Sequence, residues 1–186
     1  MSRLWQSLEG IRGLVAVPAT WRRWLGDEFD GVKGAFLRSG TKPAKSFPCP
    51  RGCGCAHEVV RHAGGRQVAV CRCEPWNCED IPVTAADLAL LGLNGSKLGR
   101  GIAKAFGCDA KETGFGVPNT WQVASFSGAA MPVVLTIQND RHGFRSAVGQ
   151  LVGRLREHFV LLAPTGRFHD AHTHGLLKGA KSGFLF

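Results

Sequence analysis

Six of the seven cysteines lie within 30 residues, between Cys49 and Cys78. Thiolate sulfur and imidazole nitrogen are the ligands that structural zinc sites use, and this stretch supplies both. A disulfide framework would normally distribute its cysteines along the whole chain, and an odd number leaves one of them unpaired. The cysteine usage therefore predicts metal binding rather than disulfide formation.

A β-hairpin is expected to bring the two groups of cysteines together. Val59 and Val60 lead into a turn that contains Gly64 and Gly65, where tight hairpins require positive φ angles, and a second strand returns over residues 68–70. The return places Cys71 beside Cys53. This layout of two short cysteine loops joined by a hairpin resembles a zinc ribbon.

One structural zinc ion is the expected cofactor. We expect the ligands to be Cys49, Cys53, Cys71 and Cys78, because turn-forming residues occupy the interval within each pair. Cys55, His57 and Cys73 are possible substitutes. A site of four thiolates leaves no open position for water, which favours a structural over a catalytic role. A second zinc ion or an iron–sulfur cluster is an open alternative, because the stretch holds six cysteines and a histidine.

The positive charge of the chain indicates a polyanionic partner. The formal net charge is +9, and lysine and arginine side chains bind phosphates with release of counterions. On the cysteine module, the basic residues expected to contact phosphate are Arg51, Arg61, Arg66 and Arg72. Nucleic acid is therefore the first expected partner, and a protein partner is the alternative.

A second candidate for nucleic-acid contact is the segment 84–106. Thr84 can cap a first helix and Ser96 a second one, with glycines between them. The segment resembles the helix-turn-helix of bacterial repressors, and the resemblance implies that Lys97, Arg100 and Lys104 face DNA from the recognition helix. A plain helical hairpin packed on the cysteine module would account for the same residues.

The hydrophobic patterning predicts an α/β or α+β protein. Strands are expected over 121–126, 133–137, 159–163 and 184–186, and helices over 144–158 and 170–181. From residue 133 onward, these elements follow one another in the order β-α-β-α-β. This order favours parallel strands with helices flanking the sheet. We expect an N-terminal helical segment (1–38), a linker and zinc-ribbon module (39–80), a helical hairpin (81–110) and a small α/β domain (111–186).

Two further groups of residues have types suited to catalysis. Asp170, His172 and His174 resemble the Asp-x-His-x-His motif of metal-dependent amidohydrolases, but few residues follow them and the segment is expected to begin a helix. Asp140 and His142 follow a buried strand and could form an acid–base pair, whereas Asp140 as a helix cap is the simpler interpretation.

No apolar run approaches the roughly 20 residues of a membrane-spanning helix, and the N-terminus lacks a secretory signal pattern. We therefore expect a cytoplasmic protein without membrane contact. The first functional hypothesis is a zinc-containing, non-catalytic nucleic-acid-binding protein, acting as a regulator or as a subunit of a larger nucleoprotein complex. The alternatives are an adaptor that binds other proteins and an enzyme that acts on nucleic acid or nucleotides.

Overall fold

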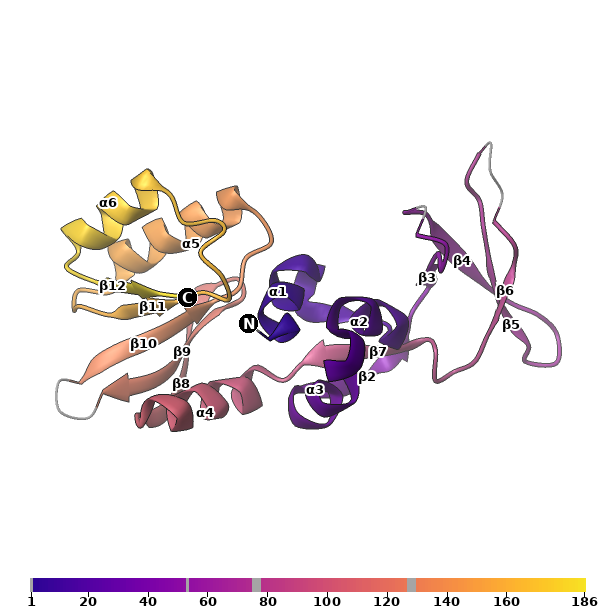
Figure 1. The fold of residues 1–186 in the computed structure, drawn as a ribbon, viewed down its shortest axis with the longest axis horizontal. Coiled ribbons are helices and arrows are strands. Elements are labelled where there is room, and N and C mark those ends of the chain that lie inside the picture. Colours follow the sequence, from indigo (N-terminus) through magenta and orange to yellow (C-terminus); the bar gives the residue numbers. More distant parts are fainter. Residues whose placement is uncertain (1, 53, 75–77, 127–129) are drawn as a thin grey trace. The chain divides into compact units, whose positions relative to one another are not determined.

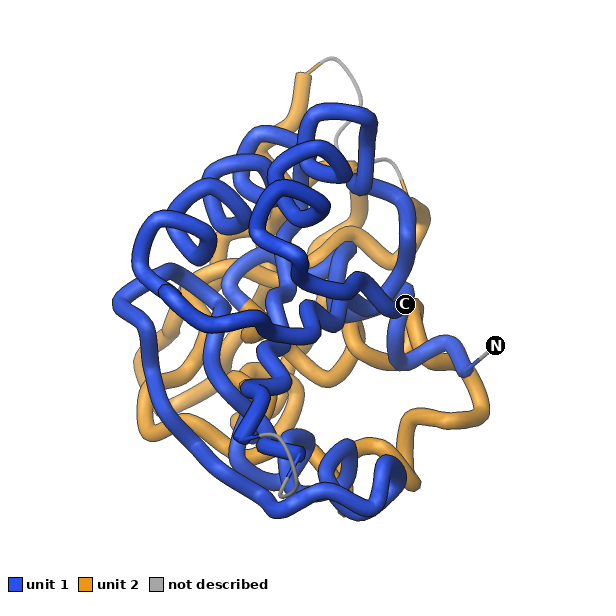
Figure 2. The backbone as a smooth tube through the Cα atoms, turned by 90° about the vertical axis from the view of Figure 1, so that its left-hand side faces the viewer, with its two compact units in different colours: residues 1–13, 94–186 blue, residues 14–93 orange. Residues whose placement is uncertain are grey.

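The computed structural model describes residues 2–52, 54–74, 78–126 and 130–186 (Figure 1). The chain forms two compact units (Figure 2). Unit 1 comprises residues 1–13 and 94–186, and unit 2 comprises residues 14–93. Helices and sheets occur in both units, so the mixed fold class expected from the sequence is confirmed. Within the described ranges, no helix is long and apolar enough to cross a membrane.

The first α-helix of unit 2 carries a fully buried tryptophan. α2 (Pro18–Leu25) and α3 (Phe29–Phe36) are joined by a 3-10 turn, η2 (Gly26–Glu28), and another 3-10 turn, η1 (Arg12–Leu14), lies before them. Pro18 is the first residue of α2, where its missing N–H has no helical partner to lose. The Trp21 side chain is fully buried and its indole N–H donates to the Leu91 carbonyl at 2.9 Å.

A three-stranded antiparallel sheet in unit 2 replaces two expected features. β7 (Ala89–Leu93) lies between β1 (Val15–Ala16) and β2 (Leu37–Pro43). The linker expected from residue 39 onward thus begins within strand β2. The first helix of the expected helix-turn-helix does not form either, because residues 85–88 are a turn and the residues that follow are β7.

Local capping and tertiary pairing explain why this helix was wrongly predicted. Thr84, expected to cap a helix, forms a reciprocal cap with Asp87: the Asp87 carboxylate accepts from the Thr84 amide at 2.9 Å, and the Thr84 hydroxyl accepts from the Asp87 amide at 3.2 Å. The cap closes only one turn. Gly92 then lies opposite Val15, and a Cβ at residue 92 would be 3.3 Å from the Val15 side chain. Pairing on both sides of β7 outweighs the helix propensity of its leucines.

The four-stranded antiparallel sheet of unit 2 carries the cysteines. Its order is β3 (Ser46–Pro48), β4 (Ala56–Arg61), β5 (Gln67–Val70) and β6 (Ile81–Val83). The expected hairpin is present between β4 and β5, with Val59 opposite Ala69, and Gly64 and Gly65 have positive φ angles of 84° and 82°. Ala69 and Val83 belong to a small apolar cluster together with Val17, Ala44 and Leu88.

Unit 1 contains a mixed five-stranded sheet, only part of which has the parallel arrangement expected from the sequence. The order is β12 (Gly183–Leu185), β11 (Val160–Leu162), β10 (Met131–Thr136), β9 (Thr120–Phe126) and β8 (Asp109–Val117). β10, β11 and β12 are parallel, with one helix in each connection, whereas β8, β9 and β10 are antiparallel. β8 was not predicted because most of its side chains are exposed and its sequence lacks apolar alternation.

The helices of unit 1 lie on both faces of this sheet (Figure 1). α4 (Gly95–Phe106) packs on β8 and β9, while α5 (Arg141–Arg154) packs beside α6 (Ala171–Gly179) on the other face. The remaining helix is α1 (Arg3–Gly10). α4 is the second helix of the expected pair, but its N-cap is Asn94 instead of Ser96, and the Asn94 side chain accepts from the Lys97 amide at 3.1 Å. The core beneath α5 includes Phe144, Leu151, Phe159 and Leu161.

Candidate metal centre

The antiparallel order of β3 to β6 brings the ends of four strands together at the cysteines. Cys49 follows β3, Cys55 directly precedes β4, Cys71 follows β5 and Cys78 precedes β6. The Cys49 amide donates to the Cys55 carbonyl at 3.1 Å, which continues the β3–β4 pairing. In an extended chain, every second side chain points to the same face. His57 therefore lies on the same face as Cys55, and Cys73 lies on the same face as Cys71.

Six side chains form two overlapping sets of possible metal ligands. Within each set, the ligand atoms all lie within 4.8 Å of one another. The first set is Cys49, Cys55, His57 and Cys78, and the second set is Cys55, Cys71, Cys73 and Cys78. Cys55 and Cys78 belong to both. The cysteine-rich group is therefore positioned to hold a metal ion.

The distances between thiols support a tetrahedral site. In a tetrahedral site with Zn–S bonds of about 2.3 Å, neighbouring sulfurs are about 3.8 Å apart. The Sγ atoms of Cys49 and Cys78 are 3.7 Å apart, and those of Cys55 and Cys71 are 3.8 Å apart. The Cys71 and Cys73 Sγ atoms are closer, at 2.9 Å, and must separate to share a metal ion. No disulfide joins any two of the six cysteines in the described part of the chain.

His57 has the arrangement of a metal ligand. Its side chain is fully buried. The Nδ1 atom lies 3.3 Å from the Ala69 carbonyl oxygen, whereas Nε2 is buried and has no hydrogen-bond partner among the described residues. Histidine ligands commonly donate their second ring N–H to a carbonyl, which orients the other nitrogen toward the metal. A buried nitrogen without a partner is unfavourable, and a metal ion bound at Nε2 would remove that cost.

The surroundings of Cys71 favour the thiolate, which is the metal-binding form. Hydrogen bonds from the Cys73 thiol, and then from the backbone amides of Cys73 and Cys78, lower the pKa of Cys71 to about 6. Cys71 is itself 7 % exposed. A thiol with this environment is already partly ionised at neutral pH, so binding a cation there displaces a proton easily.

Arg23 supports the first cysteine loop and was not singled out from the sequence. Its guanidinium donates to the Cys49 carbonyl at 2.7 Å. Carbonyl groups at the turns of a metal loop need such donors, because the loop lacks the regular pairing of a strand. Arg23 lies on α2, 26 residues before Cys49, and no local pattern signals a contact over that separation.

Three of the four expected ligands belong to the two sets. Cys49 and Cys78 share the first set, and Cys71 and Cys78 share the second. Cys53 lies outside the described residues. The three expected substitutes, Cys55, His57 and Cys73, are all members of a set.

Two arginines of the cysteine module are engaged by acidic side chains. Arg51 lies 3.3 Å from the Glu79 carboxylate, and Arg72 lies 3.4 Å from that of Glu58. Residues 46–83 contain four arginines and four acidic residues, so the module has no excess of formal positive charge before thiols are ionised. The other two expected phosphate contacts, Arg61 and Arg66, are exposed at the β4–β5 hairpin.

The three expected cations of α4 share one exposed face. Lys97, Arg100 and Lys104 are exposed, while Leu98, Ile102 and Ala103 are buried against the sheet. A spacing of three and four residues places the cations in a row along the helix. Beside this row, a pocket of about 160 Å³ is lined by Arg100, Lys111 of β8 and Trp121 of β9. Sequence reasoning missed Lys111 because β8 itself was missed.

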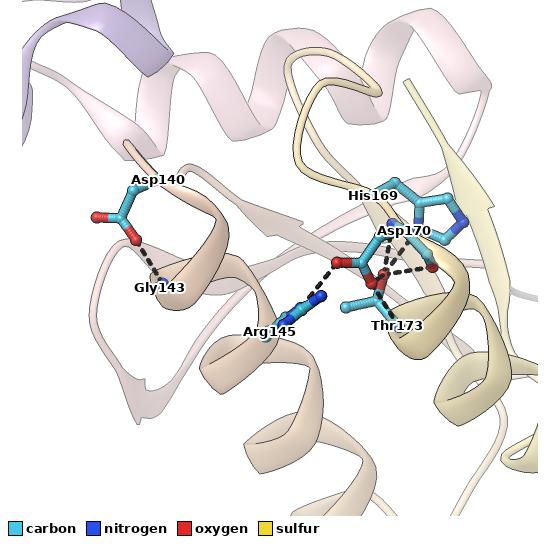
Figure 3. A network of polar contacts seen from close by, with 6 residues as sticks. All are labelled: Asp140, Gly143, Arg145, His169, Asp170 and Thr173. Atoms are coloured by element: carbon cyan, nitrogen blue, oxygen red, sulfur yellow. Dashed lines mark hydrogen bonds and ion pairs between the residues drawn. The ribbon is translucent and has the colours of Figure 1, made fainter.

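Asp140 and Asp170 act as helix caps (Figure 3). Asp140 accepts from the Gly143 amide at 2.7 Å at the start of α5, and the His142 side chain is exposed. Asp170 begins α6 and forms a capping box with Thr173, and Arg145 lies 2.7 Å from its carboxylate (Figure 3). The Thr173 amide, followed by Arg145, holds the pKa of Asp170 below its usual range.

The described histidines near α6 are not members of the two sets of metal ligands. The His169 ring stacks on Phe184 with a centroid distance of 4.2 Å. Within the described ranges, none of Asp170, His172 and His174 belongs to a set of close ligand atoms. The motif is thus the beginning of a helix, in agreement with the expected helix start.

Comparisons with protein-family models, with curated proteins and with solved structures each found no significant match to this chain.

Proposed function

We propose that the chain is a nucleic-acid-binding protein whose cysteine module is held together by zinc. Zinc is proposed because thiolates and a neutral imidazole are its preferred ligands, and because a filled tetrahedral shell requires no redox chemistry. Every position of such a shell is taken by a side chain, so the metal has a structural role. The nucleic-acid contact is assigned to unit 1.

The distribution of charge carries this assignment. Unit 1 contains 13 of the 23 lysines and arginines but only 6 of the 14 acidic residues, so it holds +7 of the formal net charge of +9. Unit 2, which contains the cysteine module, therefore holds only +2 of the net charge. Phosphate contacts depend on such local excess, because each one releases condensed counterions.

The row of Lys97, Arg100 and Lys104 is the proposed contact surface. The helix presents the row on a rigid support, because its opposite side is packed on β8 and β9. The pocket beside the row adds Lys111, so four cations face one region of unit 1. Without a partner helix before α4, these residues are proposed to bind the phosphate backbone rather than to read bases from a helix-turn-helix.

The test is a binding titration with labelled duplex DNA, single-stranded DNA and RNA over a tenfold range of salt. Three phosphate contacts correspond to a log–log slope of about −2.7 on duplex DNA, which is a roughly 500-fold loss of affinity per tenfold rise in salt. Replacing Lys97, Arg100 and Lys104 with alanine should make the log–log salt slope less negative by about 2.7. Alanine at these exposed positions retains helix propensity, so the fold should be preserved.

A charge-matched control replaces Arg38, Lys42 and Lys45, which are exposed in unit 2. This variant should retain the wild-type salt slope. Equal losses in both variants would show that α4 is not the contact surface. Absence of binding to all three nucleic acids at low salt would refute the proposed function and favour the protein-binding alternative.

A further inference from the structure

A single metal ion cannot satisfy both sets of ligands. Zinc bound by the first set would leave Cys71 and Cys73 outside the site, with their Sγ atoms 2.9 Å apart. Zinc bound by the second set would leave the buried Nε2 atom of His57 without a partner. Neither set combines Cys49 or His57 with Cys71 or Cys73. The six side chains are thus arranged around two positions rather than one.

We infer that the cluster binds two zinc ions, with the thiolates of Cys55 and Cys78 bridging them. This inference rests on the proposed zinc role and adds a second metal site to it. Cys49 and His57 complete the shell of one ion, and Cys71 and Cys73 complete the shell of the other. Two four-coordinate ions need eight bonds, and six side chains provide eight when two thiolates each bind both ions.

The membership of the two sets supports bridging by these two residues. Cys55 and Cys78 are the two residues that belong to both sets. Their sulfur atoms therefore lie within 4.8 Å of the ligand atoms of each of the other four residues. Thiolate sulfur has several lone pairs and can bind two metal ions, whereas the remaining nitrogen of His57 donates to Ala69 and cannot bridge. The imidazole can therefore bind only one of the two ions, which agrees with the membership of His57 in one set alone.

Charge also favours two ions. Five thiols lose their protons to the solvent on binding, and two Zn²⁺ ions compensate four of the five negative charges. If the same five thiols ionised around one Zn²⁺ ion, a net charge of −3 would remain. Such a charge is costly because Cys49 and Cys71 are buried. The paired ions thus allow ionisation of the whole cluster with a residual charge of −1.

The test is the number of metal ions bound by the wild-type protein. Native mass spectrometry should show two zinc ions per chain. A titration of the metal-free protein with Co²⁺ should show thiolate charge-transfer absorption that increases up to two equivalents and then stays constant. One bound ion in both measurements would overturn this inference and leave the proposed zinc role intact, whereas no bound metal, or an iron–sulfur cluster, would overturn both.

Variants distinguish bridging from terminal ligands. Cys78→Ser should lower the zinc content per chain toward zero, because both ions lose a ligand. Cys73→Ser should retain one zinc ion, because only one ion loses a ligand. Cys108→Ser is the matched control, since Cys108 lies in unit 1, and it should retain two. Equal zinc content in the Cys73→Ser and Cys78→Ser variants would contradict the bridging role.

Discussion

Removal of the metal by a chelator is expected to unfold the four-stranded sheet of residues 46–83 while the five-stranded sheet of unit 1 stays folded. The small sheet has few buried apolar residues of its own, and Ala69 and Val83 are among the few that its strands contribute. In small zinc modules, metal binding contributes about 10–16 kcal/mol at neutral pH, which is comparable to the whole stability of an ordinary domain. Amide hydrogen exchange, resolved by residue, is the measurement.

Two controls make this result specific to the metal. Addition of zinc after the chelator is removed should restore protection of β4 and β5. Protection of β9 and β10 should be unchanged throughout, because their core contains no metal ligand. If β4 and β5 keep their protection without metal, the structural role of the ion is wrong.

The second large effect is expected from Phe144→Ala in unit 1. The Phe144 side chain is 2 % exposed and lies in the core under α5, with an edge contact to Phe184 at a centroid distance of 5.9 Å. Truncation of a buried phenylalanine to alanine costs about 3–5 kcal/mol, because apolar contacts are lost and a cavity remains. Urea unfolding followed through NMR signals of unit 1 measures this loss.

Phe106→Ala provides the comparison, because the Phe106 side chain is 50 % exposed at the end of α4. Its expected effect on the free energy of unfolding is below about 1 kcal/mol. The Phe144→Ala protein should keep its full zinc content, since the metal ligands belong to unit 2. A Phe144→Ala protein as stable as the Phe106→Ala protein would contradict the described core.

Strong local patterns allowed parts of the fold to be predicted. The Gly64–Gly65 turn and its flanking valines indicated the β4–β5 hairpin, and the apolar runs at residues 133–137 and 159–163 correspond to β10 and β11. β7 was mistaken for a helix because its strand character comes from pairing with β1 and β2, which are distant in sequence. β8 was missed because it is a mainly exposed edge strand without alternation.

The metal centre was predictable in its chemistry but not in its ligand assignment. The clustering of cysteines indicates a thiolate site directly, because so many thiols in one short segment have no role in packing. The choice among them depends on how β3 to β6 end at one place, which brings Cys55 and His57 next to Cys49 and Cys78. The buried Nε2 atom of His57, which has no hydrogen-bond partner among the described residues, could not be predicted from the sequence because burial depends on the tertiary structure.

The zinc content of the protein, measured by elemental analysis after purification without added metal, tests most directly whether the cysteine cluster binds a metal ion. Cys78→Ser is measured in parallel because Cys78 belongs to both ligand sets, and Cys108→Ser is the control. We expect zinc in the wild-type and Cys108→Ser proteins and a large loss of it, with a lower melting temperature, in the Cys78→Ser protein. A wild-type protein without zinc, or a Cys78→Ser protein with the same zinc content and melting temperature, would contradict the central claim that this cluster binds a structural metal.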